Sequence, residues 1–307
     1  MTAIFDVPDS RDIIALALAE DLGVDPSWFL DAPPGLPDVL SRDVTTWSLV
    51  APETRFEGRI VARQDGVVCG MPVVGAVYDA LCAAAGLPDA VETFPLLAEG
   101  SSVARGTTVA EVSGPMVAVL AGERTALDFL MILSGIASEA RRWQDVAGEH
   151  LSVCDTRKTW PGLRALSKYA VRVGGGTNHR TGLYDMVLVK DNHRALAGGI
   201  ADAVARARAE HPELLVEIEA DTVEDAVLAV ESGADLVLLD NMDDERLADA
   251  VRRCRAAAAE LGRLVLLEAS GNITFERLPA LRRAGVDRVS ASALTLARPL
   301  DFGLDEA

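Results

Sequence analysis

The chain has little lysine, few cysteines and no long apolar runs. Lysine occurs three times in 307 residues, at Lys158, Lys168 and Lys190, and arginine carries the other positive charges. The apolar run Val117–Ala121 is far shorter than the ~20 apolar residues of a membrane-spanning helix. With a net charge of −18 and a pI near 4.6, the chain lacks the basic surface that general nucleic-acid binding needs. We therefore expect neither a membrane protein nor a nucleic-acid partner.

The few cysteines are scattered along the chain, without the paired spacing of a zinc site. They are Cys69, Cys82, Cys154 and Cys254, and we expect them to be reduced thiols in the core. The first residues include Asp6, Asp9 and Asp12 and show no charged-then-apolar signal pattern. These features together predict a cytoplasmic protein.

The three lysines belong to a cationic stretch within this acidic chain. Residues 155–194 hold eight lysines and arginines against three aspartates, although the whole chain carries −18. The same stretch holds Gly174–Gly176 and two of the four histidines, His179 and His193. A small cationic region in an acidic protein favours a small polyanion, because the surrounding negative field repels an extended one. We therefore predict the binding site in this stretch.

The first part of the chain predicts a domain that mixes helices and short strands. Residues 10–22 have the spacing of an amphipathic helix capped by Ser10. The segment Gly23–Arg42 is rich in proline and aspartate and predicts a loop or an insertion. Short β-like runs between residues 56 and 112 flank one expected helix at residues 73–85. This part is predicted to be an α+β domain.

The second part begins with a long helical segment and then repeats a β/α pattern. The helix is expected from Glu123 to about Gly148, with an interruption at Gly135. Short apolar runs with a polar end then alternate with helical segments; they are Leu151–Asp155, Val187–Lys190, Leu215–Glu219, Leu236–Asp240, Leu264–Glu268 and Arg288–Ser290. Such a repeat is typical of parallel strands in an α/β barrel. We place the α+β domain at residues 1–121 and the barrel at residues 122–307, whose last residues return to the first domain.

Three ionisable residues end successive strands of the expected barrel. Lys190, Glu219 and Asp240 would lie at neighbouring positions of its mouth, where charged groups are costly unless they are used. The alternative is that such residues only cap the next helix, and for Asp155 that alternative is favoured. Lys190 follows apolar residues, so its ammonium should be partly desolvated. Two carboxylates without nearby cysteine or histidine ligands suit a hard cation such as Mg²⁺.

Further residues of the expected mouth suit anionic groups. Arg157 and Lys158 directly follow the first strand of the barrel, where the alternative is a solvated loop pair. His179 and Arg180 follow the triple glycine, whose backbone amides can approach an anion. A turn at Ser270–Gly271, between a strand and a helix, offers amides and a hydroxyl to a phosphate. By contrast Arg164, Lys168 and Arg172 recur at helical spacing and predict a solvated helix face or contacts between subunits.

Three long motifs in this region resemble the quinolinate phosphoribosyltransferase family, which is also called carboxylating nicotinate-nucleotide pyrophosphorylase. The motifs are Asp155–Arg164, Lys168–Arg180 and Gly182–His193. Shorter similar segments extend over most of the chain, at Ala17–Gly23, Asp43–Thr46, Ala62–Gly70, Gly122–Asp128, Leu133–Ala137 and Leu238–Met242. The resemblance implies an incomplete, seven-stranded barrel after an N-terminal α/β domain. It also implies a homodimer, leaves open a higher assembly of dimers, and places Arg124 of each subunit in its partner's active site.

The resemblance further implies an activity and residue roles. The reaction is phosphoribosyl transfer from phosphoribosyl pyrophosphate to quinolinate with decarboxylation, which yields nicotinate mononucleotide, CO₂ and pyrophosphate in NAD biosynthesis. Quinolinate would be held by Arg157, His179, Arg180 and Lys190. Lys158 would serve phosphoribosyl pyrophosphate, Ser270 and Gly271 its 5-phosphate, and Glu219 and Asp240 Mg²⁺ and the ribose hydroxyls.

The chain departs from the family pattern at three places. Ser292 and Leu296 stand where the family has a glycine and a histidine near the phosphate, although the Ser292 hydroxyl can still donate to it. Asp128 replaces an expected asparagine, and Val24–Arg42 has the character of an insertion. Weaker binding of phosphoribosyl pyrophosphate is therefore expected, and a specialised paralogue for a related pyridine carboxylate stays open.

Two other functions remain compatible with the residues. A Schiff-base aldolase would use Lys190 as its nucleophile, but it would not need two carboxylates opposite a cationic cluster. A non-catalytic phosphosugar-binding relative is favoured by Leu296. The presence of Lys158, Lys190 and the two carboxylates disfavours it.

Overall fold

A computed structural model describes residues 6–30, 39–87 and 90–307, and these form two compact units. The first unit comprises the described residues up to Glu139, Trp160–Gly174 and Leu296–Ala307. The second comprises Ala140–Thr159 and Gly175–Thr295. The division therefore runs through the long helix α5 (Met116–Ala147) rather than between residues 121 and 122.

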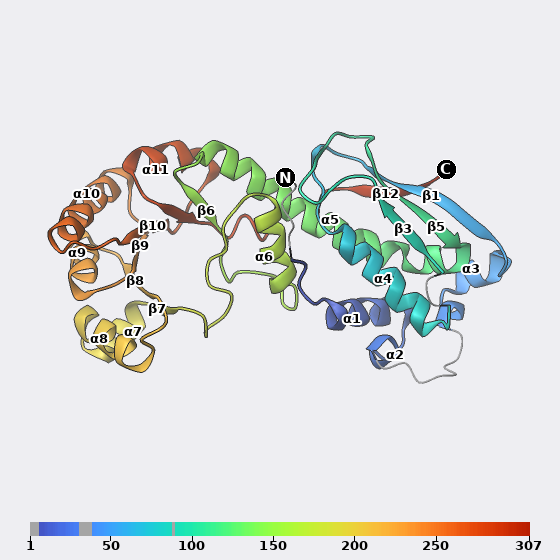
Figure 1. The fold of residues 1–307 in the computed structure, drawn as a ribbon, viewed down its shortest axis with the longest axis horizontal. Coiled ribbons are helices and arrows are strands. Elements are labelled where there is room, and N and C mark those ends of the chain that lie inside the picture. The colour runs from blue at the N-terminus through green and yellow to red at the C-terminus, as the bar shows by residue number, and fades with distance from the viewer. Residues whose placement is uncertain (1–5, 31–38, 88–89) are drawn as a thin grey trace. The chain divides into compact units, whose positions relative to one another are not determined.

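The first unit is built on a four-stranded antiparallel sheet. Its strand order is β12 (Phe302–Glu306), β1 (Arg55–Ala62), β5 (Thr108–Pro115) and β3 (Glu92–Pro95), and a small ladder joins β2 (Gly66–Val67) to β4 (Ser102–Val103). Burial alternates along most of β1, as expected for a strand with one face on a core. Strand β12 pairs with β1, so the last residues complete the N-terminal sheet (Figure 1).

Helices of the first unit confirm part of the sequence prediction and correct two details. They are α1 (Arg11–Leu22), α2 (Ser27–Leu30), α3 (Val44–Leu49), α4 (Met71–Ala84) and α6 (Arg164–Val173), with the 3₁₀ turn η1 (Val39–Arg42). The Ser10 side chain makes no capping hydrogen bond; instead Asp9 Oδ1 accepts from the amide of Arg11. The segment Gly23–Arg42 is more than a loop where it is described, because it contains α2 and η1 and buries Val39. Residues 31–38 of this segment lie outside the described residues.

Helix α5 is continuous through Gly135, contrary to the expected interruption. The glycine is required by packing: a Cβ atom there would overlap the carbonyl oxygen of Arg298 in the C-terminal segment of the same unit. Gly135 therefore marks a close backbone approach rather than a helix break.

The second unit is a parallel α/β sheet with the strand order expected for an incomplete barrel. The order is β6 (Ser152–Cys154), β11 (Arg288–Ser290), β10 (Leu266–Ser270), β9 (Leu236–Asp240), β8 (Val216–Ala220) and β7 (Val187–Val189). A parallel bridge from Cys154 to Thr177 adds a minimal seventh strand beside β6. Within the described residues no ladder joins Thr177 to β7, so the sheet stays open.

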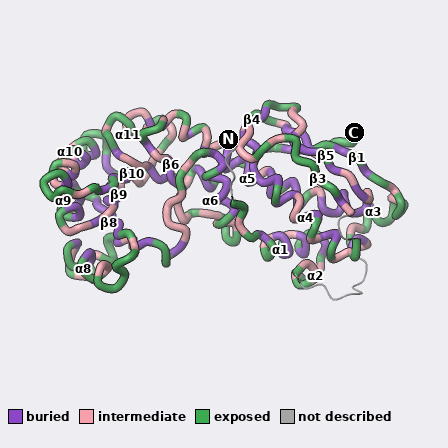
Figure 2. Tube along the Cα trace, viewed as in Figure 1, coloured by how far each residue is buried: buried purple, intermediate pink, exposed green. Residues whose placement is uncertain are grey.

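Helices cover the outer side of these strands (Figure 1). They are α7 (Asp191–Ala197), α8 (Ile200–Glu210), α9 (Val223–Ser232), α10 (Asp244–Glu260) and α11 (Leu278–Ala284), with the 3₁₀ turn η2 (Phe275–Arg277). Figure 2 shows that the central strands are buried and the helices exposed on their outer faces. In the described part of the chain, no helix is both long and apolar enough to cross a bilayer. All four cysteines are buried and free, as predicted.

Strand β10 begins two residues later than expected. Leu266 pairs with Leu236 and Ser270 with Asp240, which puts Glu268 in the middle of the strand and not at its end. The reason is that Leu264 is 98% exposed and belongs to the preceding loop. The side chain of Glu268 therefore lies inside the sheet's core, where it is fully buried.

Candidate active site

The residues predicted for the site gather at the carboxyl ends of the parallel strands of the second unit. They are Arg157 and Lys158 after β6, His179 and Arg180 after the Thr177 bridge, Lys190 after β7, Glu219 in β8, Asp240 at the end of β9, Ser270 and Gly271 at the end of β10, and Ser292 after β11. Parallel strands all run in one direction, so these ends share one edge of the sheet.

Lys190 pairs with Glu219 across neighbouring strands. The Nζ atom of Lys190 lies 2.9 Å from Glu219 Oε2, and 48% of the lysine side chain is exposed. The amino group is therefore less desolvated than expected, and it donates to a carboxylate. Its backbone amide donates to His193 Nδ1 at 3.0 Å, which fixes the first turn of α7. This geometry argues against the aldolase alternative, because an amine engaged with a carboxylate is not free to attack a carbonyl carbon.

Asp240 lies in a region of concentrated negative charge. Burial raises the pKa of Asp240, and the charges of Glu219 and Asp221 raise it further, whereas Lys190 acts in the opposite direction. A divalent cation would relieve this repulsion, and carboxylate oxygens are the donors that Mg²⁺ prefers. Glu219 and Asp240 are therefore the residues that could hold Mg²⁺.

Arg157 and Arg180 form a cationic pair at the mouth. Burial lowers the pKa of Arg180, and the charge of Arg157 lowers it further, so the two guanidinium groups lie close enough to repel each other. The buried Nε atom of Arg157 has no hydrogen-bond partner among the described residues. Two partly desolvated arginines with an unused donor are an arrangement that a bound anion stabilises.

His179 points into the interior of the sheet and not freely into the mouth. Its Nε2 atom lies 3.1 Å from Glu217 Oε2 and 3.5 Å from Glu268 Oε1, and its Nδ1 atom accepts from the Arg180 amide at 2.7 Å. Burial lowers the pKa of His179, but the contact with Glu217 and the charge of Glu268 outweigh it and raise the pKa above its usual value. A direct contact with a substrate carboxylate would require the ring to turn.

The triad His179, Glu217 and Glu268 has the residue types of a metal site, and its ligand atoms lie within 4.8 Å of one another. However, Arg288 Nε lies 2.9 Å from Glu268 Oε2 and supplies a positive charge there. A metal at His179 Nε2 would also need a proton on Nδ1, which instead faces the Arg180 amide. This triad is therefore better described as an internal polar network that includes Arg288.

Asp155 anchors the segment that carries His179 and Arg180, and does not cap a helix as expected. Its carboxylate accepts from Asn178 Nδ2 at 2.5 Å and from the His179 amide at 3.0 Å, and the residue is fully buried. Lys168 also differs from the prediction of a solvated helix face, because it is only 2% exposed.

The loops after β6 and β11 are tied together at the mouth. Thr295 Oγ1 donates to the carbonyl oxygen of Lys158 at 2.7 Å and lies 3.4 Å from that of Ser292. Thr295 therefore links the Lys158 loop to the turn that differs from the family pattern. Nothing in the sequence marked this threonine, since its role depends on the approach of two loops.

Other site residues were also missed at the level of sequence. Glu217 could have been found, because it shares a strand face with Glu219. Asn241, Asn272 and Arg288 could not, because their contacts depend on turns and on the register of neighbouring strands.

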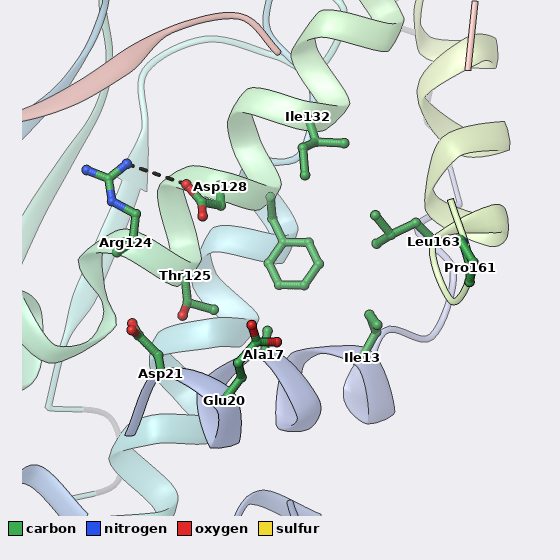
Figure 3. A pocket seen from close by; sticks show the side chains of 11 residues that line it. Ile13, Ala17, Glu20, Asp21, Arg124, Thr125, Asp128, Ile132, Pro161 and Leu163 are labelled. Atoms are coloured by element: carbon green, nitrogen blue, oxygen red, sulfur yellow. Dashed lines mark hydrogen bonds and ion pairs between the residues drawn. The ribbon is translucent and has the colours of Figure 1, made fainter. Parts of the chain in front are cut away.

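Arg124 belongs to the first unit, where it borders a cavity of about 450 Å³ (Figure 3). The cavity is lined mainly by apolar residues of α1, α5 and the segment before α6, among them Ile13, Phe129, Ile132 and Leu163. Arg124 Nη1 lies 3.4 Å from Asp128 Oδ1, and both side chains are more than half exposed. The aspartate that departs from the family pattern is thus the ion-pair partner of Arg124.

Known proteins and structures resemble the whole chain. The family description "Quinolinate phosphoribosyl transferase, C-terminal domain" matches residues 136–305, and the corresponding N-terminal domain matches residues 43–134. The nicotinate-nucleotide pyrophosphorylase (carboxylating) of Mycobacterium leprae is 39% identical over 300 residues, which cover 96% of each chain. The probable enzyme of that name from Synechocystis sp. is 39% identical over 87% of this chain and 89% of its own. The crystal structure of NadC from Streptococcus pyogenes, at 31% identity, covers 99% of this chain and 98% of its own with a TM-score of 0.84.

Proposed function

The chain belongs to the quinolinate phosphoribosyltransferase family, and from this membership we infer that it is a carboxylating nicotinate-nucleotide pyrophosphorylase, a pentosyltransferase of NAD biosynthesis. In this reaction C1 of the ribose loses its bond to pyrophosphate and gains one to the pyridine nitrogen of quinolinate. The bond from C2 of the ring to its carboxylate then breaks, CO₂ leaves, and a proton takes its place.

The main structural support for this function is the cationic pair Arg157 and Arg180. Two adjacent carboxylates on one ring need more than one cation, and this pair offers two guanidinium groups with an unused buried donor. Lys190 is proposed as the third cation of the clamp. His179 is proposed as its fourth member, and in the present geometry it acts through the amide of Arg180. A clamp of this kind holds the pyridine nitrogen in line with the ribose carbon.

Phosphoribosyl pyrophosphate is proposed to use the ends of the central strands β8 to β11 together with Lys158. Lys158 would neutralise charge on the departing pyrophosphate. Ser270 and Gly271 would receive the 5-phosphate at the end of β10, with the Ser292 hydroxyl as a further donor. The ribose hydroxyls would be held by Glu219 and Asp240.

Glu219 and Asp240 are also the residues that we propose to hold Mg²⁺. When bound, the cation would neutralise negative charge on the pyrophosphate. If so, Glu219→Ala and Asp240→Ala abolish turnover while the protein remains folded, and excess chelator silences the wild type. Full turnover in chelator would remove this assignment.

We propose that the active form is a homodimer of a cytoplasmic protein, in which Arg124 completes the partner's site. Its exposed position beside the cavity of the first unit leaves the guanidinium available to another chain. A specialised paralogue is the second candidate, favoured by Ser292 and Leu296, of which Leu296 is about half exposed.

Arg180→Ala tests the clamp. Loss of a buried charge-assisted pair should weaken quinolinate binding by about 2–5 kcal/mol, or roughly 30-fold to several thousand-fold, as measured by calorimetry. Arg253→Ala, which removes an exposed arginine paired with Glu224 on the outer helices, is the matched control and should leave affinity unchanged. Unaltered quinolinate binding by Arg180→Ala would show that Arg180 does not hold quinolinate. Tighter binding of a different pyridine carboxylate by the wild type would favour the specialised paralogue.

A further inference from the structure

Two asparagines near the mouth have an unusual backbone. Among the described residues, Asn241 and Asn272 are the only non-glycine residues with positive φ, at 53° and 49°. Asn241 directly follows β9, and Asn272 lies two residues beyond the end of β10. A left-handed backbone is unfavourable for residues with a side chain, and it tends to be kept where function requires it.

The side-chain amide of Asn241 joins the two strand ends. Its Nδ2 atom donates to Asp240 Oδ2 at 2.6 Å, and its Oδ1 atom accepts from Asn272 Nδ2 at 3.0 Å. Its backbone amide donates to the carbonyl oxygen of Ser270 at 3.0 Å. One residue therefore contacts the carboxylate at the end of β9 and the turn at the end of β10.

Gly271, in the turn after β10, packs closely against the side-chain amide of Asn241. It has a φ of 78°, and a Cβ atom at this position would overlap Oδ1 of Asn241. Only a residue without a side chain lets the turn approach the Asn241 amide this closely. The turn and the asparagine thus fit each other as one unit.

We propose that Asn241 and Asn272 are positioning residues, whose linked amides hold Asp240 and the Ser270–Gly271 turn in fixed relation for the ribose 5-phosphate end of the substrate. This inference rests on the proposed function. An amide suits the role because it donates and accepts at once: Nδ2 supports the carboxylate while Oδ1 receives the second asparagine. A carboxylate in the same place could not donate to Asp240, and it would add a like charge.

Glycine substitutions test the proposal without disturbing the backbone. Because glycine tolerates positive φ, Asn241→Gly and Asn272→Gly remove the amides but keep the turns, and thermal unfolding confirms that both variants fold. Binding of ribose 5-phosphate without Mg²⁺, measured by calorimetry, and KM for each substrate are the readouts. Asn241→Gly should weaken the binding of ribose 5-phosphate, and raise the KM for phosphoribosyl pyrophosphate, roughly tenfold or more. The reason is that a hydrogen bond to a charged group is lost. KM for quinolinate should stay within about twofold, since its cations are not touched.

The double variant distinguishes a linked pair from two separate residues. If the amides act as one chain, Asn241→Gly with Asn272→Gly should bind ribose 5-phosphate no worse than Asn241→Gly alone. Asn241→Asp, which keeps the shape and loses the donor, should match Asn241→Gly or be worse. Additive losses, unchanged ribose 5-phosphate binding, or an equal rise in both KM values would overturn the proposal. A wild type that neither binds ribose 5-phosphate nor turns over quinolinate would instead overturn the proposed function.

Discussion

The positions of His179 and Arg180 depend on a group of ionisable side chains in the interior of the sheet. Glu217 and Glu268 lie beneath His179, and Arg288 balances them from β11. Removing one member of such a buried network leaves another charge without its partner. The resulting loss of stability usually exceeds the net stabilisation that the intact network provides. Arg180 depends on this network, because its amide is held by His179.

The charge of Glu217 should control the titration of His179. Because the folded protein binds this proton more tightly than the unfolded chain, His179 contributes stability below its ordinary pKa and loses it as the pH rises through the raised value. Glu217→Gln should therefore lower the pKa of His179. The loss of stability in this variant, relative to wild type, should be larger at pH 5.5 than at pH 8 (about one unit below and about one and a half units above the ordinary histidine pKa). Histidine NMR and urea unfolding at both values measure this.

The matched control is Glu245→Gln, an exposed carboxylate in the first turn of α10. It should shift neither the His179 resonance nor the pH dependence of unfolding. A His179 titration that is the same in Glu217→Gln and wild type would show that Glu217 does not set its charge.

At the scale of elements, the parallel strands could be predicted because apolar runs with polar ends repeat along the second half of the chain. The same runs placed Lys190, Glu219 and Asp240 at strand ends. The apolar runs predict strand bounds less well, as β10 shows. Leu264 is apolar but exposed, and it led to a predicted start two residues too early. The residue type alone does not tell whether an apolar side chain is buried or exposed.

Some features could not be predicted from the residues alone, because they depend on which of two neighbouring side chains makes a contact, on a local backbone angle, or on the approach of distant segments. Ser10 has the right type for a helix cap, but Asp9 contacts the helix amide instead. Gly135 looks like a helix break, yet it makes room for the C-terminal segment. The left-handed turn of Asn241 is equally invisible, because most asparagines adopt ordinary backbone angles.

Helix α5 provides a test of the packing argument. Gly135→Ala should destabilise the protein by about 1–3 kcal/mol, because its Cβ would overlap the Arg298 carbonyl and force the C-terminal segment to move. Gly75→Ala in α4 is the matched control, since its Cβ would lie an ordinary 3.4 Å from Thr93 Oγ1. There, alanine should be neutral or stabilising by up to about 1 kcal/mol. Equal losses in the two variants, measured by urea unfolding, would show that Gly135 has no special packing role.

At the scale of the whole molecule, the proposed dimer makes a quantitative prediction. If Arg124 serves the partner's barrel, Arg124→Ala and Lys190→Ala should each be inactive and should restore activity when mixed. Random exchange makes about half the dimers mixed, each with one intact site, so roughly a quarter of wild-type activity should return. Native mass spectrometry confirms the exchange of subunits. Exchange without recovered activity would mean that each Arg124 serves its own chain or none.

The central claim is that this chain couples phosphoribosyl transfer to the loss of one carboxylate. The most direct measurement follows nicotinate mononucleotide, CO₂ and pyrophosphate in one reaction of the purified protein with quinolinate, phosphoribosyl pyrophosphate and Mg²⁺. The proposed cationic clamp and the family membership predict equal amounts of the three products, and little product when nicotinate replaces quinolinate. Nicotinate mononucleotide formed as readily from nicotinate, or formed without an equivalent of CO₂, would contradict the account.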